Sequence, residues 1–408
     1  DLADMAGKNQ LAFRVEFLKG QIPKENQLYW RALILSEFDG LEWSVKSGED
    51  FYHTVKMNSP LWLRETQFLG KPIPYRVILP ATGQRFAVSL ELSKPGTEEF
   101  LYTRDLRFLF PDKIVQTKEY EMVAYQKFIL ENRLSKLRYD QETKLPIEGN
   151  ERSKSYAKKM FERAGQHPRV YIQSILNSFK QDPFFYTLKA PKLEKDIIDA
   201  FLFDSRKGFC AHYASALVFL ARSVGIPARV VVGYQGGEIN PFGQYLVVKQ
   251  LDAHAWSEIW FEEAGWVRYD PTTYIAESRV LDTPEQMAGD ATASEDAILA
   301  GGSFQQWAGF RAMRQWGDYM ELKWNKVVVS FDKERQEALL SQFWGKLTRQ
   351  LFLMLSAVAL FLMGALFIWF WLTSKKSELN ELERAYLEYC ALLEENGFNV
   401  IVYVDYAA

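Results

Sequence analysis

Cysteine is scarce in this sequence: two residues, Cys210 and Cys390, occur among 408, and histidine is nearly as rare with four. Two thiols far apart in the chain exclude a small secreted fold held together by a disulfide framework. Four histidines leave little material for a metal cluster of cysteine and histidine. Cys210 is therefore a single thiol whose role has to follow from the residues around it.

An excess of charge of one sign is also lacking. Lys and Arg total 49 against 52 Asp and Glu, which gives a net charge of −3. Because nucleic-acid binding needs a basic surface, we expect no nucleic-acid partner. No repeat or low-complexity tract is present, and hydrophobic residues make up 48% of the chain, enough for a buried core. The length favours two to three domains of roughly 150 residues each.

The first part of the chain has the pattern of β-strands. Residues 11–17 and 28–35 alternate or run apolar, and Asp39-Gly40 is typical of a turn. We therefore predict a β-rich domain over residues 1–125.

Helical patterns follow this region. Mixed charges over residues 118–165 and 168–181 favour helices with exposed faces. Residues 282–302 are small, polar and acidic, as in a linker. Aromatic residues recur at helical spacing over residues 303–345, and a packing face is the interpretation we favour over a ligand site.

One long hydrophobic run is present. Residues 351–372 carry no charge, and at about 1.5 Å per residue a helix of this length spans roughly 33 Å, against about 30 Å for a bilayer core. Trp344 before the run and Trp369 and Trp371 at its end suit the two membrane interfaces. We predict a transmembrane helix, with a buried helix of a large soluble protein as the alternative. Basic residues flank both ends, so charge does not decide the orientation.

Cys210 stands at the start of a predicted helix. Gly208 ends a loop, and small or apolar residues then recur at helical spacing, as at Ala214, Leu217 and Val218. In the first turn of a helix, the unpaired N–H groups and the helix dipole stabilise an anion such as a thiolate. A small buried cysteine without chemistry is the alternative that position alone leaves open.

Two later segments supply a base and an acid. Residues 252–260 alternate with period two, which places His254 on one face of a strand. Residues 265–269 form a second short strand that ends at Asp270, and the turn between them predicts an antiparallel pair with Asp270 beside His254. Cys210, His254 and Asp270 are therefore predicted as nucleophile, base and orienting carboxylate.

Other polar residues nearby have structural interpretations. Asp252 lies roughly 6.5–7 Å from the histidine along the same strand, too far for a direct hydrogen bond. His212 points some 200° away from the cysteine on a helix, so we expect it to pack or to face solvent. Arg222 and Arg229 are expected to form structural ion pairs, and Cys390, without a His or acid arranged with it, is expected to be structural.

These segments resemble the core of bacterial membrane-anchored transglutaminase-like proteins. The resemblance covers residues 183–279 and rests on Gly208-Phe-Cys210, His212-Tyr-Ala214, Gly225-Ile-Pro-Ala-Arg229, Asp252-Ala-His-Ala-Trp256 and Asp270-Pro-Thr272. The segments Tyr29-Trp-Arg31 and Phe38-Asp-Gly40 are also similar to that family. The resemblance implies an α+β fold with a papain-like transglutaminase core, in which a helix bearing Cys210 packs on an antiparallel sheet bearing His254 and Asp270.

The resemblance also implies an organisation and a location. We expect a β-rich extracytoplasmic domain (1–125), a catalytic core (126–281), a linker (282–302), a helical stem (303–350), a transmembrane helix (351–372) and a cytoplasmic tail (373–408). Further membrane helices are expected before residue 1. The catalytic domain would lie on the periplasmic side of the bacterial inner membrane, with cell-envelope proteins or peptides as substrates.

The expected chemistry is thiol acyl transfer. Cys210 would form a thioester from a carboxamide such as a Gln side chain and pass the acyl group to a primary amine. A cysteine peptidase or amidase would use the same three residues with water as acceptor, and a non-catalytic envelope scaffold is the alternative of another class. The intact set of three residues argues against the scaffold.

Two features of the expected site are less defined. The backbone N–H of Cys210 is a natural first donor to the oxyanion. Animal transglutaminases use a Trp upstream of the cysteine, but no Trp lies between Trp62 and Trp256, so Tyr186 is the candidate for the second donor. The three residues require no metal or organic cofactor, and no calcium-binding loop is recognisable.

Overall fold

The computed structural model describes residues 9–19, 22–45, 61–96, 100–103, 106–281, 308–324, 349–373 and 381–396. The chain divides into two compact units, residues 1–320 and 321–408. The first unit contains the sheets and all three predicted site residues.

Two larger sheets organise the first unit. The six-stranded sheet has the order β15 (Glu238–Asn240), β16 (Tyr245–Lys249), β1 (Leu11–Phe17), β5 (Gln67–Leu79), β11 (Lys118–Ile129) and β8 (Ser93–Pro95). The five-stranded sheet has the order β18 (Gly265–Tyr269), β17 (Ala253–Phe261), β14 (Ala228–Gln235), β2 (Tyr29–Leu35) and β7 (Ser89–Leu90). The pairs within both sheets are antiparallel.

Three small sheets complete the β-structure of the described residues. They pair β6 (Phe86–Ala87), β10 (Phe108–Leu109) and β9 (Leu101–Tyr102); β3 (Glu37–Phe38) and β4 (Trp43–Ser44); and, in parallel, β12 (Phe185–Tyr186) and β13 (Lys207–Gly208).

Both larger sheets combine strands from the two ends of the first unit. The five-stranded sheet places β2 and β7 beside β14, β17 and β18, and the six-stranded sheet takes in β15 and β16. The predicted division at residue 125 therefore separates stretches of sequence but does not separate sheets. Both β2 and β14 are largely buried, because the sheet that they share is covered by a hydrophobic core on each face.

The prediction of helix over residues 118–165 is wrong for its first part. Residues Lys118–Ile129 form β11, which pairs with β5 along nearly its whole length. Tyr120, Met122 and Ala124 alternate as buried residues with more exposed neighbours. The lysines and glutamates between them favour a helix locally, but pairing with a long neighbouring strand outweighs that preference.

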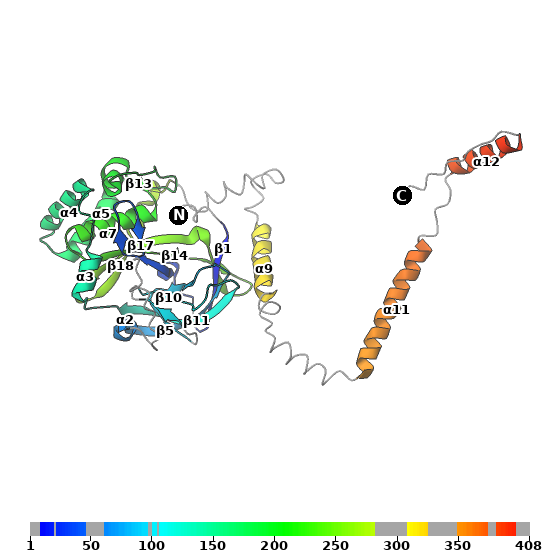
Figure 1. Ribbon diagram of the computed structural model, residues 1–408, viewed down its shortest axis with the longest axis horizontal. Coiled ribbons are helices and arrows are strands. Elements are labelled where there is room, and N and C mark those ends of the chain that lie inside the picture. The colour runs from blue at the N-terminus through cyan, green and yellow to red at the C-terminus, as the bar shows by residue number, and fades with distance from the viewer. Residues whose placement is uncertain are drawn as a thin grey trace. The chain divides into compact units, whose positions relative to one another are not determined.

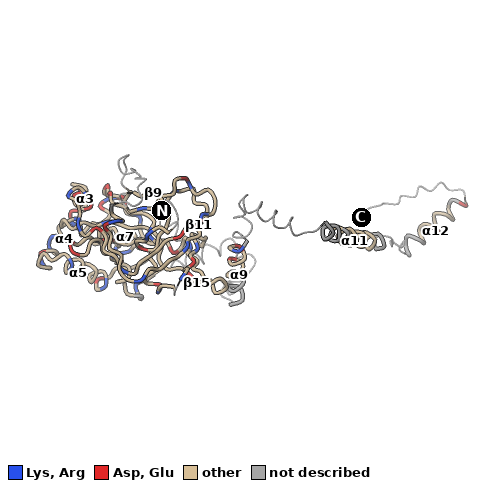
Figure 2. Tube along the Cα trace, turned by 90° about the horizontal axis from the view of Figure 1, so that it is seen from below, with Lys and Arg blue, Asp and Glu red and all other residues tan. Residues whose placement is uncertain are grey.

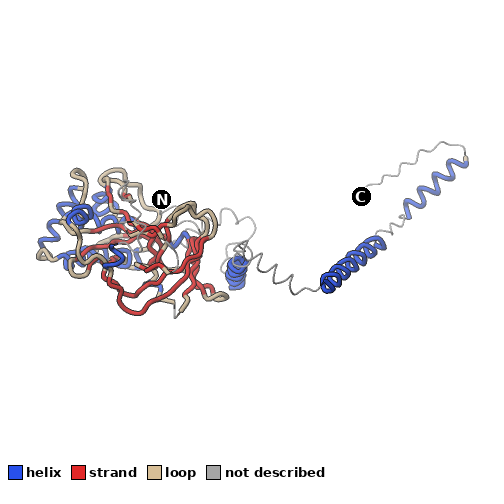
Figure 3. Tube along the Cα trace, turned by 60° about the horizontal axis from the view of Figure 1, so that its bottom comes forward, coloured by secondary structure: helices blue, strands red, loops and turns tan. Residues whose placement is uncertain are grey.

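The helices of the first unit gather on one face of the five-stranded sheet. They are α3 (Lys136–Glu142), α4 (Glu151–Arg163), α5 (Pro168–Gln181), α6 (Ile197–Asp199) followed by a π-helical turn (Ala200–Ser205), and α7 (Cys210–Ser223). The short α2 (Leu61–Glu65) lies elsewhere, by β5. Figure 1 shows α4, α5 and α7 on one side of β14, β17 and β18, and β5, β10 and β11 on the other. Figure 3 shows the same separation of helices from strands.

Two hydrophobic cores lie on the two faces of this sheet. The first packs α7 and α5 against Val230, Ala255 and Ile259. The second packs the six-stranded sheet against Trp256 and Trp266 from the opposite face of the same strands. The sheet that carries the predicted histidine is thus buried on both sides, which fixes the strand register.

A buried ion cluster holds the sheet at its centre. Glu258 of β17 accepts hydrogen bonds from Arg31 of β2 (Nη1–Oε2 3.1 Å) and from Arg229 of β14 (Nε–Oε2 2.9 Å). The guanidinium of Arg229 also lies 3.8 Å from the ring centre of Trp266. Burial alone would raise the pKa of Glu258, yet the two guanidinium groups lower it to about 2.

Charges of both signs are interspersed over the surface of the first unit. Figure 2 shows Lys and Arg beside Asp and Glu along α3 and α4. This agrees with the small net charge of −3.

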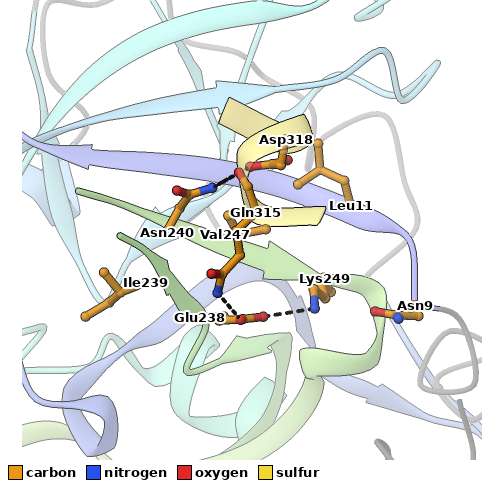
Figure 4. A pocket seen from close by; sticks show the side chains of 9 residues that line it. All are labelled: Asn9, Leu11, Glu238, Ile239, Asn240, Val247, Lys249, Gln315 and Asp318. Carbon is orange, nitrogen blue, oxygen red and sulfur yellow. Dashed lines mark hydrogen bonds and ion pairs between the residues drawn. The ribbon is translucent and has the colours of Figure 1, made fainter. Parts of the chain in front are cut away.

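Helix α9 (Ala308–Trp324) begins in the first unit and docks there through Asp318. The Asp318 carboxylate accepts from Arg14 of β1 (Nε–Oδ1 3.0 Å) and from Tyr245 of β16 (2.5 Å). A pocket of about 160 Å³ lies between this helix and β15–β16. Figure 4 shows Gln315 bridging Asn240 and Glu238 across it. None of the three predicted site residues lines this pocket.

The C-terminal predictions have mixed outcomes. Residues 351–372 lie within helix α11 (Arg349–Thr373), and the tail contains helix α12 (Glu381–Glu395). Among the residues that the structure describes, no helix is both long and apolar enough to cross a membrane. The structure therefore does not show the transmembrane span. The predicted linker at 282–302 and residues 325–348 of the predicted stem lie outside the described residues.

Replacing Glu258 by Gln tests the ion cluster. The variant leaves two buried guanidinium groups without their counter-charge, so the free energy of unfolding should fall by about 3–5 kcal/mol in chemical denaturation. The matched variant Glu162→Gln, on the exposed face of α4, should change it by less than about 0.5 kcal/mol. Because the folded-state pKa of Glu258 is lowered, its contribution is present above the usual glutamate range and is lost as pH falls towards 2. Equal stability of the two variants would contradict this role.

Candidate active site

Cys210 is the first residue of α7, as the sequence pattern predicts. It follows Phe209, whose backbone is extended. Only 3% of the surface of Cys210 is exposed. Gly208 is required just before it, because a side-chain Cβ at that position would lie 2.8 Å from His212 and 2.9 Å from Phe201. The start of the helix is therefore packed tightly around the thiol.

His254 and Asp270 meet as strand pairing predicts. His254 lies near the start of β17, and Asp270 follows the end of β18, the antiparallel neighbour of β17. The distance between His254 Nε2 and Asp270 Oδ2 is 2.8 Å. The Cys210 thiol lies beside the His254 ring, close enough that it helps to raise the pKa of the imidazole. Since Nε2 is occupied by Asp270, Nδ1 is the ring nitrogen left for the thiol.

Two donors to Asp270 were not predicted from the sequence. The Thr272 backbone N–H and hydroxyl donate to Oδ1, at 3.1 and 2.6 Å. The Tyr29 hydroxyl donates to Oδ2 at 2.7 Å. The first has a signal in the sequence, because Asp followed by Pro and Thr is typical of a capped helix start, and Asp270 caps the 3-10 helix Pro271–Tyr274. The second has no local signal, because Tyr29 belongs to β2.

The pair of His254 and Asp270 is charged at neutral pH. Burial lowers the pKa of His254, but the charge and hydrogen bond of Asp270, together with Cys210, outweigh burial and raise it to about 10. Burial raises the pKa of Asp270, but His254, Thr272 and Tyr29 outweigh burial and lower it to about 2. The imidazolium stabilises a thiolate on Cys210 and holds the proton that a leaving amine needs.

Tyr186 lies beside the thiol. Its strand, β12, pairs in parallel with β13, so that Tyr186 is opposite Gly208, two residues before Cys210. Its carbonyl accepts from the N–H of Leu281 on the other side, so the backbone of Tyr186 is held from both edges. The Tyr186 hydroxyl lies close enough to the Cys210 backbone N–H and thiol to interact with both. Burial and the charge of Cys210 raise the pKa of Tyr186, which therefore stays a donor.

The remaining candidates have structural surroundings. Asp252 accepts from the Lys249 backbone N–H at 2.8 Å. His212 accepts from the Phe209 N–H at 3.3 Å, and burial lowers its pKa to about 4. Arg222 pairs with Glu142 at 3.2 Å, and Arg229 pairs with Glu258, so the prediction of structural ion pairs for both arginines is confirmed.

Within the described parts of the chain, no three His, Cys, Asp or Glu side chains gather as metal ligands would. The expectation that the reaction needs no metal or organic cofactor stays a prediction.

Comparison with known proteins agrees with this arrangement. The family model of the transglutaminase-like superfamily matches residues 155–271, and that of the TgpA N-terminal domain matches residues 1–130. A protein of Pseudomonas aeruginosa named protein-glutamine gamma-glutamyltransferase is 36% identical over 371 residues, which are 90% of this chain and 53% of that protein. The chain thus spans about half the length of that relative.

Solved structures show the same relationship. The crystal structure of the periplasmic domain of TgpA from Pseudomonas aeruginosa is 37% identical, with a TM-score of 0.62 over 70% of this chain and 96% of that domain. The same domain bound to ethylmercury is 36% identical, with a TM-score of 0.62 over 69% of this chain and 96% of that one. This chain belongs to the bacterial transglutaminase-like proteins. The α+β core with an N-terminal β-rich region is confirmed.

Separate replacement of Asp270 and Asp252 by Asn tests which of the two aspartates orients His254. Asp270→Asn should lower kcat by about 10⁴-fold, because replacing the orienting carboxylate by Asn has an effect of this order in a serine triad. The variant also lacks the charge that raises the pKa of His254, so the basic limb of the pH–rate profile should move to lower pH. Asp252→Asn is the control and should keep kcat within about threefold of wild type. Equal losses in both variants would contradict the assignment.

Tyr186→Phe separates oxyanion stabilisation from thiol reactivity. Loss of one oxyanion donor should lower kcat for a carboxamide substrate by about 10²–10³-fold. Alkylation of Cys210 by iodoacetamide forms no oxyanion, so its rate should stay within about threefold. A parallel loss of both rates would show that Tyr186 serves only to place the cysteine.

Proposed function

We propose that this chain is a membrane-tethered thiol acyltransferase of the transglutaminase type, with its catalytic domain outside the cytoplasmic membrane. The observation that carries the proposal is the assembly of Cys210, His254 and Asp270 at the start of α7, with His254 hydrogen-bonded to Asp270 and beside the thiol. The name of the Pseudomonas relative supports the same reaction class.

The first half-reaction forms a thioester. With the proton already on His254, the Cys210 sulfur attacks as a thiolate the carbonyl carbon of a Gln-like carboxamide. Negative charge then develops on the carbonyl oxygen, within reach of the Tyr186 hydroxyl. The imidazolium returns the proton to the amide nitrogen, the C–N bond breaks, and ammonia leaves.

The second half-reaction transfers the acyl group. A primary amine attacks the thioester carbonyl while His254 accepts one proton from the attacking nitrogen. The C–S bond breaks, and the proton returns from His254 to the Cys210 sulfur. The sum is one carboxamide and one amine converted to one substituted amide and ammonia, with the enzyme unchanged.

Hydrolysis is the second candidate. Water could resolve the same thioester, which would give a cysteine peptidase or amidase with the same residues. The burial of Cys210 and His254, which are 3% and 8% exposed, favours the transferase, because a site with little water access disfavours hydrolysis of the thioester. A non-catalytic envelope scaffold is disfavoured by the charged, fully hydrogen-bonded pair of His254 and Asp270.

The location and substrates belong to the proposal. The apolar sequence of residues 351–372 supports tethering to the bacterial inner membrane, and the periplasmic origin of the solved relative supports a periplasmic catalytic domain. Cell-envelope proteins or peptides would then supply both the carboxamide and the amine.

Incorporation of a labelled amine tests the reaction. The full chain in detergent is incubated with a Gln-containing peptide and a fluorescent primary amine, and the product is measured by mass spectrometry. We expect amine incorporation that Cys210→Ala reduces to background. Cys390→Ala is the matched control, since it removes the other of the two thiols and should keep full activity.

The products distinguish the three candidates. Deamidated or cleaved peptide without incorporated amine would favour hydrolysis. No turnover with either acceptor, together with a Cys210 that resists iodoacetamide, would favour the scaffold and overturn the proposal.

A further inference from the structure

Tyr29 joins the catalytic residues from a distant part of the sequence. It lies at the start of β2, which pairs with β14, and its hydroxyl donates to Asp270 Oδ2 at 2.7 Å. The same oxygen binds His254 Nε2 at 2.8 Å. One carboxylate oxygen therefore receives two hydrogen bonds, one from the catalytic histidine and one from a residue of the N-terminal segment.

The ring of Tyr29 is fixed on several sides. It packs edge to face on Trp256, with ring centres 5.2 Å apart, and it lies 6.2 Å from the ring of His254. The guanidinium of Arg268 lies 3.7 Å from the ring centre, and Arg268 also pairs with Glu91. The backbone N–H of Glu91 in turn donates to the Tyr29 carbonyl at 2.8 Å. Tyr29 is 3% exposed, so little solvent reaches this arrangement.

The approach of β2 to the catalytic strands depends on one glycine. Gly233 of β14 lies opposite His254 on one side and Arg31 on the other. A Cβ at Gly233 would lie 1.8 Å from the Trp30 carbonyl oxygen. The backbones are therefore closest at the point where β2 delivers Tyr29 to the site.

We propose that Tyr29 is a positioning residue of the catalytic centre. Its hydroxyl fixes the orientation of the Asp270 carboxylate and weakens the attraction of that carboxylate for the His254 imidazolium. The inference rests on the proposed function. With both hydrogen bonds on Oδ2, the carboxylate cannot rotate without losing one of them. The second donor also withdraws negative charge from the oxygen that faces the imidazolium.

This moderation has a chemical purpose. His254 must release its proton to the leaving amine and later accept one from the attacking amine, so an imidazolium held too strongly is a poor acid. The titratable and charged groups around His254 are Asp270, Cys210 of α7, Tyr29 of β2, Arg268 behind Tyr29, and Tyr186 beyond the thiol. Removal of the Tyr29 donor leaves more charge on Asp270 and should hold the proton on His254 more firmly.

Tyr29→Phe in the full chain tests this role. The ring and its packing remain, and one hydrogen bond to a charged group is lost, so kcat should fall by about 10- to 100-fold. The ring nitrogens of His254 are followed by NMR titration of protein labelled in histidine, which has four such residues, with His254→Gln as the assignment reference. The midpoint of His254 and the basic limb of the kcat/KM profile should both move to higher pH.

Tyr171→Phe is the matched control. Its hydroxyl is also buried and donates to the Leu220 carbonyl at 2.9 Å, outside the catalytic centre. It should lose stability without moving the midpoint of His254. Replacement of Tyr29 by 3,5-difluorotyrosine keeps the hydroxyl and makes it a stronger donor, so the midpoint should move in the opposite direction, to lower pH.

Two outcomes would overturn the inference. One is a His254 midpoint that stays unchanged in both Tyr29 variants. The other is a Tyr29→Phe protein with kcat within twofold of wild type. The titration needs no substrate, so it decides the role of Tyr29 even if the full chain incorporates no amine, a result that would count against the proposed function alone.

Discussion

The pairing of β2 with β14 is the constraint on which the rest of the first unit depends. It joins a strand at residues 29–35 to one at residues 228–235 and so completes the sheet that carries His254. Arg31 on β2 and Arg229 on β14 both reach Glu258 on β17, so the pairing brings two like charges to one buried carboxylate that they share. The same strand presents Tyr29 to Asp270. Structure and chemistry therefore depend on one contact between distant segments.

The local part of the candidate site could be predicted from the sequence. Cys210 at a helix start and Asp270 beside His254 follow from periodicity and from a short turn between two strands, which are local properties. The cap at Thr272 is also local and could have been inferred from Asp270-Pro271. The positions of the donors Tyr29 and Tyr186, by contrast, do not follow from local sequence patterns. Tyr186 is placed by a two-residue strand too short to produce a pattern, and Tyr29 by a pairing across some two hundred residues, so only the folded structure, or likeness to a known fold, places them.

The fold could be predicted to a similar extent. Helices α4, α5 and α7 follow from their amphipathic or apolar spacing. In strand β11 the residues Lys118, Glu119 and Glu121 favour a helix locally, whereas the conformation is decided by eleven paired positions on β5. The sequence also gives no indication of which strands pair within the two sheets, because the residue pattern of a single strand does not depend on its partner.

The separation of β2 and β14 in the sequence has a consequence for how the chain folds. Contacts between residues this far apart form late, because the intervening chain must lose its conformational freedom before the pairing stabilises anything. During synthesis from the N-terminus, β2 leaves the ribosome long before β14 exists. Its run of Tyr29, Trp30, Leu33 and Ile34 is then an exposed apolar edge that must be kept from wrong partners. The hydrogen bond from Tyr29 to Asp270 forms only when β2 pairs with β14, so the set of residues around His254 is completed late in folding.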